Sequence, residues 1–489
     1  MRELQMKFVT NTATIRWMRI LDLFELEPLC STRSLAKASS STTRTIVTDI
    51  TDMKSHFKDA LHIDSSHKGY IFTVLNPAKY LAAKRALITD EILFHIVESI
   101  FQHEEMRSSE WAERYHISES TVLRYLRKVQ PVLRDYHLQL DYNPITFIGD
   151  EMDIRKFFHD FYYESEITAH TIFPPIAIHD ITVKAFSDCQ RTNKQACSFG
   201  ELNYYLYITL ERYCGGHTVK LPKKISKLFS TKEDFKEFAE INQHIFEHYQ
   251  QRLPQEEILY LFLLVWSRRS ISDVTGEEVF CQKYNQWAEI TQLASDFVAT
   301  CIPETKNSSR DHILIESFFT VAKIKQLLSP LLNHNIADVN LYAQRLFPES
   351  YQKCRNFLTE NPLAVATWNK KSLSHLSASL TIYLESIKSL YWHTKKNVAF
   401  LFEGSYILCQ YLKSKSMHYL HSSKNFFFPD SNELSPDYLM MNHIDLVVTN
   451  YTEYVSDYAN DIDCLIFKTF PDKNDWNKLA KCLNPHINA

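Results

Sequence analysis

The side chains whose types and spacing best suit a chemical task lie in residues 106–130, and the task is binding a polyanion. Three hydroxyls and then three cations follow one another along this stretch: Ser118, Ser120, Thr121, Arg124, Arg127 and Lys128. Short hydroxyls can reach base edges where a helix enters a major groove, and long cations can reach the phosphates on the groove walls. The pattern favours binding of double-stranded DNA. An ordinary helical hairpin with a solvated basic face is the alternative.

Two short helices must position these groups. Apolar residues keep one face across the stretch, interrupted by a polar turn over 116–120: Trp111, Ala112, Tyr115, Ile117, Val122, Leu123 and Leu126. Ser118 is a good N-cap for the second helix, which leaves Ser120 and Thr121 at an exposed N-terminus. The pattern predicts a helix-turn-helix with the second helix as the recognition helix.

An earlier copy of the same module strengthens this prediction. Residues 34–37 and 42–46 align with 110–113 and 118–122 at one constant offset, with small, apolar and hydroxyl positions in register. Thr42, Thr43 and Arg44 are therefore candidate DNA contacts. A hairpin predicted over 61–74 makes the module a winged helix, with Lys68 at the tip of the wing near a phosphate. A hairpin that only closes the small core is equally compatible with the sequence.

The overall composition predicts a mainly helical protein of several domains. The chain has 489 residues, 45% of them hydrophobic, only 7 glycines, a formal net charge of −4 and a pI of about 6.6. A nucleic-acid surface must therefore be a local patch. Ten cysteines without a CxxC pair indicate buried thiols in a reducing cytosol. The longest apolar run, 258–266, is too short for a membrane span, so we expect a cytoplasmic protein without membrane contact.

The segments beyond the two modules differ in pattern. A linker is predicted over 76–86, and a pair of strands is predicted within 138–148. The region that follows is predicted to be helical, with helices over 154–164, 176–189, 202–213, 231–251 and 256–269. A related succession of helices is predicted over 286–388. From residue 396 three apolar β-rich runs, at 397–402, 444–450 and 463–470, alternate with helical segments. This last region predicts a small α/β domain with a parallel sheet.

Little in the chain suggests an enzyme. It has no P-loop, GxGxxG, GxSxG or HExxH motif. His244 and His248 stand four apart with Glu247 beside them, a spacing that could hold a metal, but the sequence places no third ligand. We expect no catalytic residue, no cofactor and no bound metal.

The order of these regions resembles the Mga/AtxA family of transcriptional regulators of Gram-positive bacteria over essentially the whole chain. The resemblance implies winged helix-turn-helix domains over 1–76 and 77–160, two helical phosphotransferase-system regulation domains over 165–285 and 286–392, and an enzyme IIB-like α/β domain over 393–489. The resemblance further implies a regulator that binds promoter DNA, and it favours activation of transcription and a role in virulence or carbohydrate uptake. It also implies that the protein assembles into dimers or larger oligomers. The sugar phosphotransferase system would modulate it through histidines.

Several positions depart from the family pattern. Tyr205 and Leu264 stand where the first regulation domain would carry histidines, so His217 is the substitute there, and His312 and His375 are the candidates in the second, with His375 preferred. Glu403 occupies the place of the phosphorylatable cysteine of an enzyme IIB subunit, and Cys409 is expected to serve packing. The last domain is therefore expected to dock or dimerise. An RNA-binding antiterminator and a protein-interaction module that does not bind DNA are the alternative functions.

Overall fold

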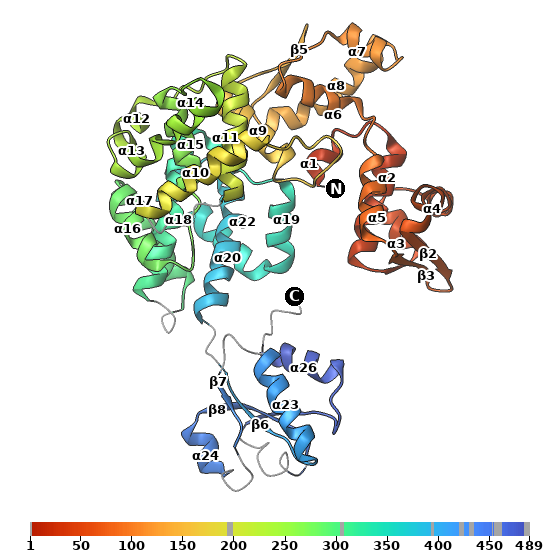
Figure 1. Cartoon of the computed structure of the whole chain (residues 1–489), viewed down its shortest axis with the longest axis vertical. Helices are drawn as coiled ribbons and strands as arrows, with labels where there is room; N and C mark the ends of the chain where they lie inside the picture. Colours follow the sequence, from red (N-terminus) through yellow and green to blue (C-terminus); the bar gives the residue numbers. More distant parts are fainter. Residues whose placement is uncertain are drawn as a thin grey trace. The chain divides into compact units, whose positions relative to one another are not determined.

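The computed structural model describes residues 2–192, 199–303, 308–392, 396–419, 425–429, 435–451, 453 and 462–483. It forms two compact units, Met1–Glu385 and Ser386–Ala489. The first is almost entirely helical and the second is an α/β unit (Figure 1). The prediction of a mainly helical, multidomain chain is confirmed. None of the described helices combines the length and the hydropathy that a membrane span requires.

The first helix-turn-helix module has its own small core. Its elements are α1 (Glu3–Met6), which precedes it, then α2 (Thr12–Leu26), β1 (Leu29–Cys30), α3 (Thr32–Ala38), α4 (Thr43–Phe57), a 3-10 turn (Lys58–Ala60), β2 (Leu61–Ser66) and β3 (Gly69–Val74). β2 and β3 pair as an antiparallel hairpin, and β1 adds a third strand beside β3. Phe24, Leu35 and Phe57 are among the buried residues that hold the helices against this sheet.

The second module is built on the same plan but shares its core with later helices. It comprises α6 (Ile92–Phe101), α7 (Ser108–Arg114), α8 (Glu119–Asp135), β4 (Gln139–Tyr142) and β5 (Ile145–Ile148), followed by α9 (Glu151–Tyr162). Trp111 and Phe147 pack in one cluster with Phe157 and Phe161 of α9 and Ile208 of the later helix α11. The second module is therefore continuous with the helical body.

The linker predicted over 76–86 is wrong, because these residues form helix α5 (Pro77–Ala86). The side chain of Asn76 accepts a hydrogen bond from the Lys79 amide at 3.1 Å, and Pro77 occupies the first turn. Both are start signals of a helix, since a proline there loses no intrahelical bond. Tyr80 packs into the core of the first module.

The repeat seen in the sequence is also present in the backbone. Ser40 and His116, 76 positions apart, both adopt positive φ, 51° and 52°. The amide of Ser41 donates to the Ala36 carbonyl at 2.9 Å, and that of Ile117 donates to the Ala112 carbonyl at 3.0 Å. The buried residues of the two recognition helices match at the same offset: Ile46 and Val122, Ile50 and Leu126, Met53 and Val129, Phe57 and Leu133. The chain carries the same turn twice.

The rest of the first unit is helical. Its elements are α10 (Ile176–Thr192), α11 (Phe199–Cys214), α12 (Lys223–Phe229), α13 (Glu233–Ala239), α14 (Ile241–Tyr249), α15 (Gln255–Trp266), α16 (Val274–Tyr284), α17 (Ala288–Cys301), α18 (Ser309–Leu328), a 3-10 turn (Pro330–Asn333), α19 (Ala337–Leu346), α20 (Pro348–Glu360), α21 (Pro362–Thr367) and α22 (Lys370–Ile387). A π-turn (Lys388–Trp392) follows within the second unit. The single helix predicted over 231–251 is two helices, α13 and α14, which meet at Glu240.

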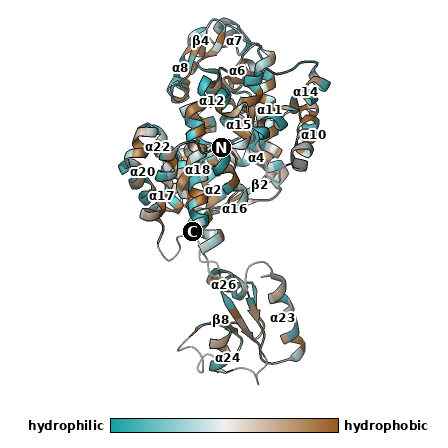
Figure 2. Ribbon diagram, turned by 90° about the vertical axis from the view of Figure 1, so that its left-hand side faces the viewer, coloured by the Kyte–Doolittle hydropathy of each residue, from teal (hydrophilic) through white to brown (hydrophobic). Residues whose placement is uncertain are grey.

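The second unit contains a parallel sheet, as the sequence predicts. Its strands lie in the order β7 (Asn425–Phe427), β6 (Asn397–Leu401), β8 (Ile444–Thr449), β9 (Asp463–Ile466), with α23 (Tyr406–Tyr419), α24 (Pro436–Met441) and α26 (Lys473–Leu483) as its helices. β8 is hydrophobic along most of its length (Figure 2). Leu479 of α26 packs on one face and Leu439 of α24 on the other. The three-residue strand β7 does not stand out in the sequence.

Candidate nucleic-acid interface

The N-terminus of α8 presents a cluster of hydroxyl groups. Ser118 caps the helix, and its Oγ accepts a hydrogen bond from the Thr121 amide at 3.3 Å. The same oxygen lies 2.9 Å from the Ser120 Oγ and 2.9 Å from the Thr121 Oγ1. Ser118 and Ser120 are exposed and Thr121 is half-buried. When a nucleic acid binds, these hydroxyls can give up their hydrogen bonds to one another and form hydrogen bonds to it. No buried surface has to be exposed for this exchange.

The three predicted cationic contacts of α8, Arg124, Arg127 and Lys128, are all exposed, but their surroundings differ. The Lys128 ammonium donates to the carbonyl of Val9 at 2.8 Å. The Arg124 guanidinium lies 5.6 Å from the ring centre of its neighbour Tyr125. Arg127 forms no ion pair or hydrogen bond with the residues that the structure describes. The sequence treats the three as equivalent phosphate contacts, whereas here Lys128 also fastens the N-terminal segment to α8.

The first module repeats the arrangement at α4. The side chain of Thr42 caps the helix by accepting from the Thr45 amide at 3.2 Å. Thr43 and Arg44 follow it and are exposed. Lys68 is exposed at the tip of the β2–β3 hairpin, where its amide donates to the Ser66 Oγ at 3.2 Å. The predicted contacts of the first module thus lie at the N-terminus of α4 and at the hairpin, whereas those of the second extend from the N-cap of α8 along the helix to Lys128.

Two further exposed arginines fit the same task but do not stand out in the sequence pattern. Arg107 precedes α7 and Arg33 lies in the first turn of α3, so each belongs to the first helix of its motif. In a helix-turn-helix this helix crosses the DNA backbone. A basic residue at its start is the signal that could have identified both.

The three candidate histidines are each engaged with neighbours. His375 accepts at Nδ1 from the Asn335 amide at 3.2 Å, and its ring stacks 4.4 Å from that of His334. Burial, with Lys371 nearby, lowers the pKa of His375 to about 4. The Nε2 atom of His312 lies 2.8 Å from the Ser295 Oγ.

His217, the substitute named for the first regulation domain, is half-buried. Its ring stacks on His103 at 5.3 Å, and burial lowers its pKa.

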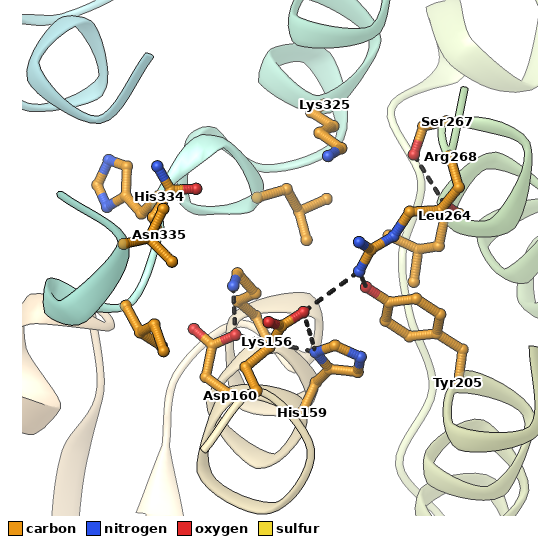
Figure 3. Close-up of a pocket in the computed structure, with 14 residues that line it drawn as sticks. Lys156, His159, Asp160, Tyr205, Leu264, Ser267, Arg268, Lys325, His334 and Asn335 are labelled. Atoms are coloured by element: carbon orange, nitrogen blue, oxygen red, sulfur yellow. Dashed lines mark hydrogen bonds and ion pairs between the residues drawn. The ribbon is translucent and has the colours of Figure 1, made fainter. Parts of the chain in front are cut away.

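The positions where the resemblance would have histidines line a cavity of about 170 Å³ (Figure 3). Tyr205 stacks on the buried His159 at 4.3 Å and accepts a hydrogen bond from Arg268 at 3.4 Å, while Leu264 lies on the same wall. Lys325 points into the cavity, and among the described residues no carboxylate pairs with it (Figure 3). Burial, with Arg268 and Lys156 nearby, lowers the pKa of Lys325 to about 7.

In the second unit Glu403 follows strand β6. Its amide donates to the Asn450 Oδ1 at 2.8 Å, and the Asn450 side-chain amide donates back to the Glu403 carbonyl at 2.8 Å. Cys409 is half-buried and its thiol donates to the Phe402 carbonyl at 3.3 Å. Burial raises the pKa of this thiol, which agrees with a packing role.

His244 and His248 do not come together with a third ligand among the described residues. The Nδ1 atom of His244 is 3.8 Å from a carboxylate oxygen of Glu247, and Lys184 already pairs with that carboxylate at 2.9 Å. His248 is exposed. A metal at this helix face would have to displace the lysine.

Residues 79–162, which contain the second module, match the family model described as the Mga helix-turn-helix domain. The chain is 24% identical over 399 residues to a protein of Streptococcus pneumoniae serotype 4 named "Putative trans-acting regulator", an alignment that covers 78% of this chain and 76% of the relative. It is 22% identical over 290 residues to the capsule synthesis positive regulator AcpB of Bacillus anthracis, covering 58% of this chain and 60% of that protein. The likeness extends well beyond the matched domain.

Proposed function

This chain is a transcriptional regulator of the Mga/AtxA type, and from that premise we propose that it acts by binding double-stranded DNA through α8 and α4. The observation that carries the proposal is the duplicated module, with the same turn, a hydroxyl cap on each recognition helix and exposed cations on both, Arg44 in the first turn of α4 and Arg124 and Arg127 further along α8. Ser120, Thr121 and Thr43 would touch bases, while Arg124, Arg127 and Arg44 would touch phosphates. Two modules require a site long enough for both helices.

The test is a salt titration of binding to duplex DNA, with the intact chain compared with Arg124→Ala/Arg127→Ala/Lys128→Ala. A matched control removes three exposed lysines of α12, at Lys223, Lys224 and Lys227. We expect salt-sensitive binding that collapses in the α8 variant and survives in the α12 variant. Equal loss in both variants would indicate a general charge effect. Tighter binding to single-stranded RNA would favour the antiterminator alternative.

We propose that the second unit mediates self-association. Tyr406, Ile407 and Tyr411 at the start of α23 are 76%, 79% and 57% exposed, and such a group of apolar side chains is unusual on a surface that faces only water. Replacing the three with serine should shift the protein toward monomer in light scattering. An unchanged mass would contradict this role.

We propose that the phosphotransferase system acts on His375, which depends on a local rearrangement. Because the Asn335 amide donates to Nδ1, the neutral ring carries its proton on Nε2, and neither nitrogen offers a free lone pair. Phosphorylation therefore requires the Asn335 segment to move away. Incubation with phosphoenolpyruvate and the general phosphotransferase proteins should label the intact chain but not His375→Ala. Labelling that persists in this variant and disappears in His312→Ala or His217→Ala would reassign the site.

A further inference from the structure

Three metal-type ligand atoms converge beside the second module. His95 and Glu98 stand three apart on α6, and His170 comes from the segment between α9 and α10. The Nδ1 atoms of His170 and His95 lie 3.5 Å and 3.7 Å from the same oxygen of Glu98, and all three ligand atoms are within 4.8 Å of one another. His170 is buried, and the other two residues are half-buried.

The tautomers of both rings are fixed by the backbone. The Nε2 atom of His95 is 3.0 Å from the carbonyl oxygen of Thr89, and that of His170 is 2.9 Å from the carbonyl oxygen of Ile88. A carbonyl oxygen can only accept, so each Nε2 carries a proton. In the neutral rings both Nδ1 lone pairs therefore face the carboxylate. Histidines that bind metals are held in the same way, through a second nitrogen bonded to a carbonyl.

Protonation of the two rings does not give every Nδ1 atom of this cluster a favourable partner. A proton on one Nδ1 would pair that ring with Glu98, but the second ring would still direct a lone pair at the same carboxylate. Charging both rings would place two cations side by side, since the ring centres are 4.5 Å apart. Burial, with His170 nearby, lowers the pKa of His95, and Arg114 adds another positive charge close by. One divalent cation between the three atoms would satisfy all of them.

The distances suit a tetrahedral ion. Zinc bonds to nitrogen and oxygen of about 2.0–2.1 Å place neighbouring tetrahedral ligands roughly 3.3 Å apart. The two nitrogen–oxygen distances of 3.5 Å and 3.7 Å require only small side-chain movements, and the two nitrogens, which lie within 4.8 Å of each other, must approach to about the same separation. We propose that His95, Glu98 and His170 bind a divalent transition metal with the preferences of Zn²⁺, with water as the fourth ligand.

A second cluster of similar composition shows why this one is singled out. His159, Glu164 and Glu201 also gather within 4.8 Å. There, however, Arg268 pairs with Glu164 at 3.3 Å and with Glu201 at 2.8 Å. A fixed cation already balances those carboxylates, whereas Glu98 forms no ion pair with any lysine or arginine among the described residues.

The proposed metal site would connect the second module to the segment that follows α9. His95 and Glu98 belong to the first helix of the second module, and the ring of His95 lies 6.0 Å from that of Tyr115, just before the turn. His170 is 72 positions from Glu98 along the chain. A bound metal would therefore fasten the segment after α9 to the domain that carries α8.

The test uses the full-length chain, stripped with a chelator and titrated with Zn²⁺ in competition with a chromogenic chelator. A parallel titration with Co²⁺ records the visible absorption, which reports the geometry and any thiolate ligand. We expect one equivalent of metal per chain, a tetrahedral Co²⁺ spectrum without a thiolate band, and a higher unfolding temperature with Zn²⁺. Glu98→Gln and His170→Gln should each weaken binding by at least about 100-fold, more than the loss of a supporting residue.

Control variants keep the result interpretable. His244→Gln/His248→Gln removes the histidine pair of α14 and should leave the affinity unchanged. Glu98→Gln is nearly isosteric, and its unfolding temperature without metal shows whether the domain still folds. Absence of stoichiometric binding would overturn the proposal. Binding that persists in folded Glu98→Gln, or that shows a thiolate band, would overturn it as well.

Discussion

Arg127 and Lys128 are adjacent on α8 and carry the same charge, yet the structure predicts different effects of removing them. Lys128 donates to the Val9 carbonyl at 2.8 Å, while Arg127 is exposed and has no such bond to a described residue. Arg127→Gln should therefore remove a phosphate contact. Lys128→Gln should instead remove a bond within the protein.

The magnitude follows from counterion release. Each phosphate contact contributes about 0.9 to the slope of log affinity against log salt. Between about 50 and 200 mM salt, one contact changes the affinity by about 3.5-fold. We expect Arg127→Gln to reduce the slope by about 0.9 for every duplex tested, and Lys128→Gln to leave the slope unchanged. Lys128→Gln should lower stability by about 1 kcal/mol, because a partly exposed hydrogen bond from a charged donor is lost.

The assay is fluorescence anisotropy of a labelled duplex across that salt range, with thermal unfolding of each variant measured beside it. Equal slope losses in both variants would mean that Lys128 leaves Val9 to bind phosphate. A slope that stays at the intact value in Arg127→Gln would refute the placement of α8 on the DNA. A loss confined to one promoter would mean that Arg127 contacts bases.

Three further predictions concern the positions that hold the fold. Ser118→Ala removes the cap of α8 and should cost about 1 kcal/mol, seen as a lower unfolding temperature that Ser118→Asp largely restores. Lys325 has a pKa of about 7 in the folded chain, against an ordinary value of 10.5. Below pH 7 the side chain is charged in the folded and the unfolded chain, so the full cost of burying the charge lowers the stability. This cost disappears as the pH rises toward 10.5. Lys325→Met should therefore raise the unfolding temperature more at about pH 6 than at about pH 9; an equal gain would contradict the burial of this charge. Glu257→Gln leaves the buried Arg155 without its bidentate partner and should cost about 3 kcal/mol in calorimetry, a loss that Arg155→Met combined with Glu257→Leu should largely reverse.

The two modules could be predicted from sequence because their signals are local. A hydroxyl cap, a polar turn and apolar residues at helical spacing all lie within about two dozen residues, and the repeat doubles the evidence. Helix α5 could also have been predicted, because Asn76 and Pro77 are start signals, although a proline after a strand is easily taken as a break.

The remaining features depend on partners that are distant in sequence. The bond between Lys128 and Val9 joins residues 119 positions apart, so no spacing rule predicts it. The pair His95 and Glu98 is visible as a helical i, i+3 spacing, but His170 becomes its neighbour only in the folded chain. The cavity around Lys325 likewise combines α9, α11, α15 and α18, and no single segment predicts it.

The second module is joined to the helical body by buried charges, and with the proposed DNA binding this determines how a signal could change the affinity. Arg155 of α9 donates to Glu257 of α15 at 2.5 Å and 3.1 Å, and Glu151 of α9 accepts from Arg212 of α11 at 2.9 Å and 2.8 Å. These contacts leave little room for α9 to move independently of the body. The first module has its own cluster and, among the described residues, no charge pair to α11 or α15; its links include Met18 of α2, which packs in the cluster of the second module, and Lys84 of α5, which lies 3.7 Å from Glu166. A change in the helical body would therefore carry α8 with it and alter its spacing from α4, which a DNA site spanning both helices would sense as a change in affinity.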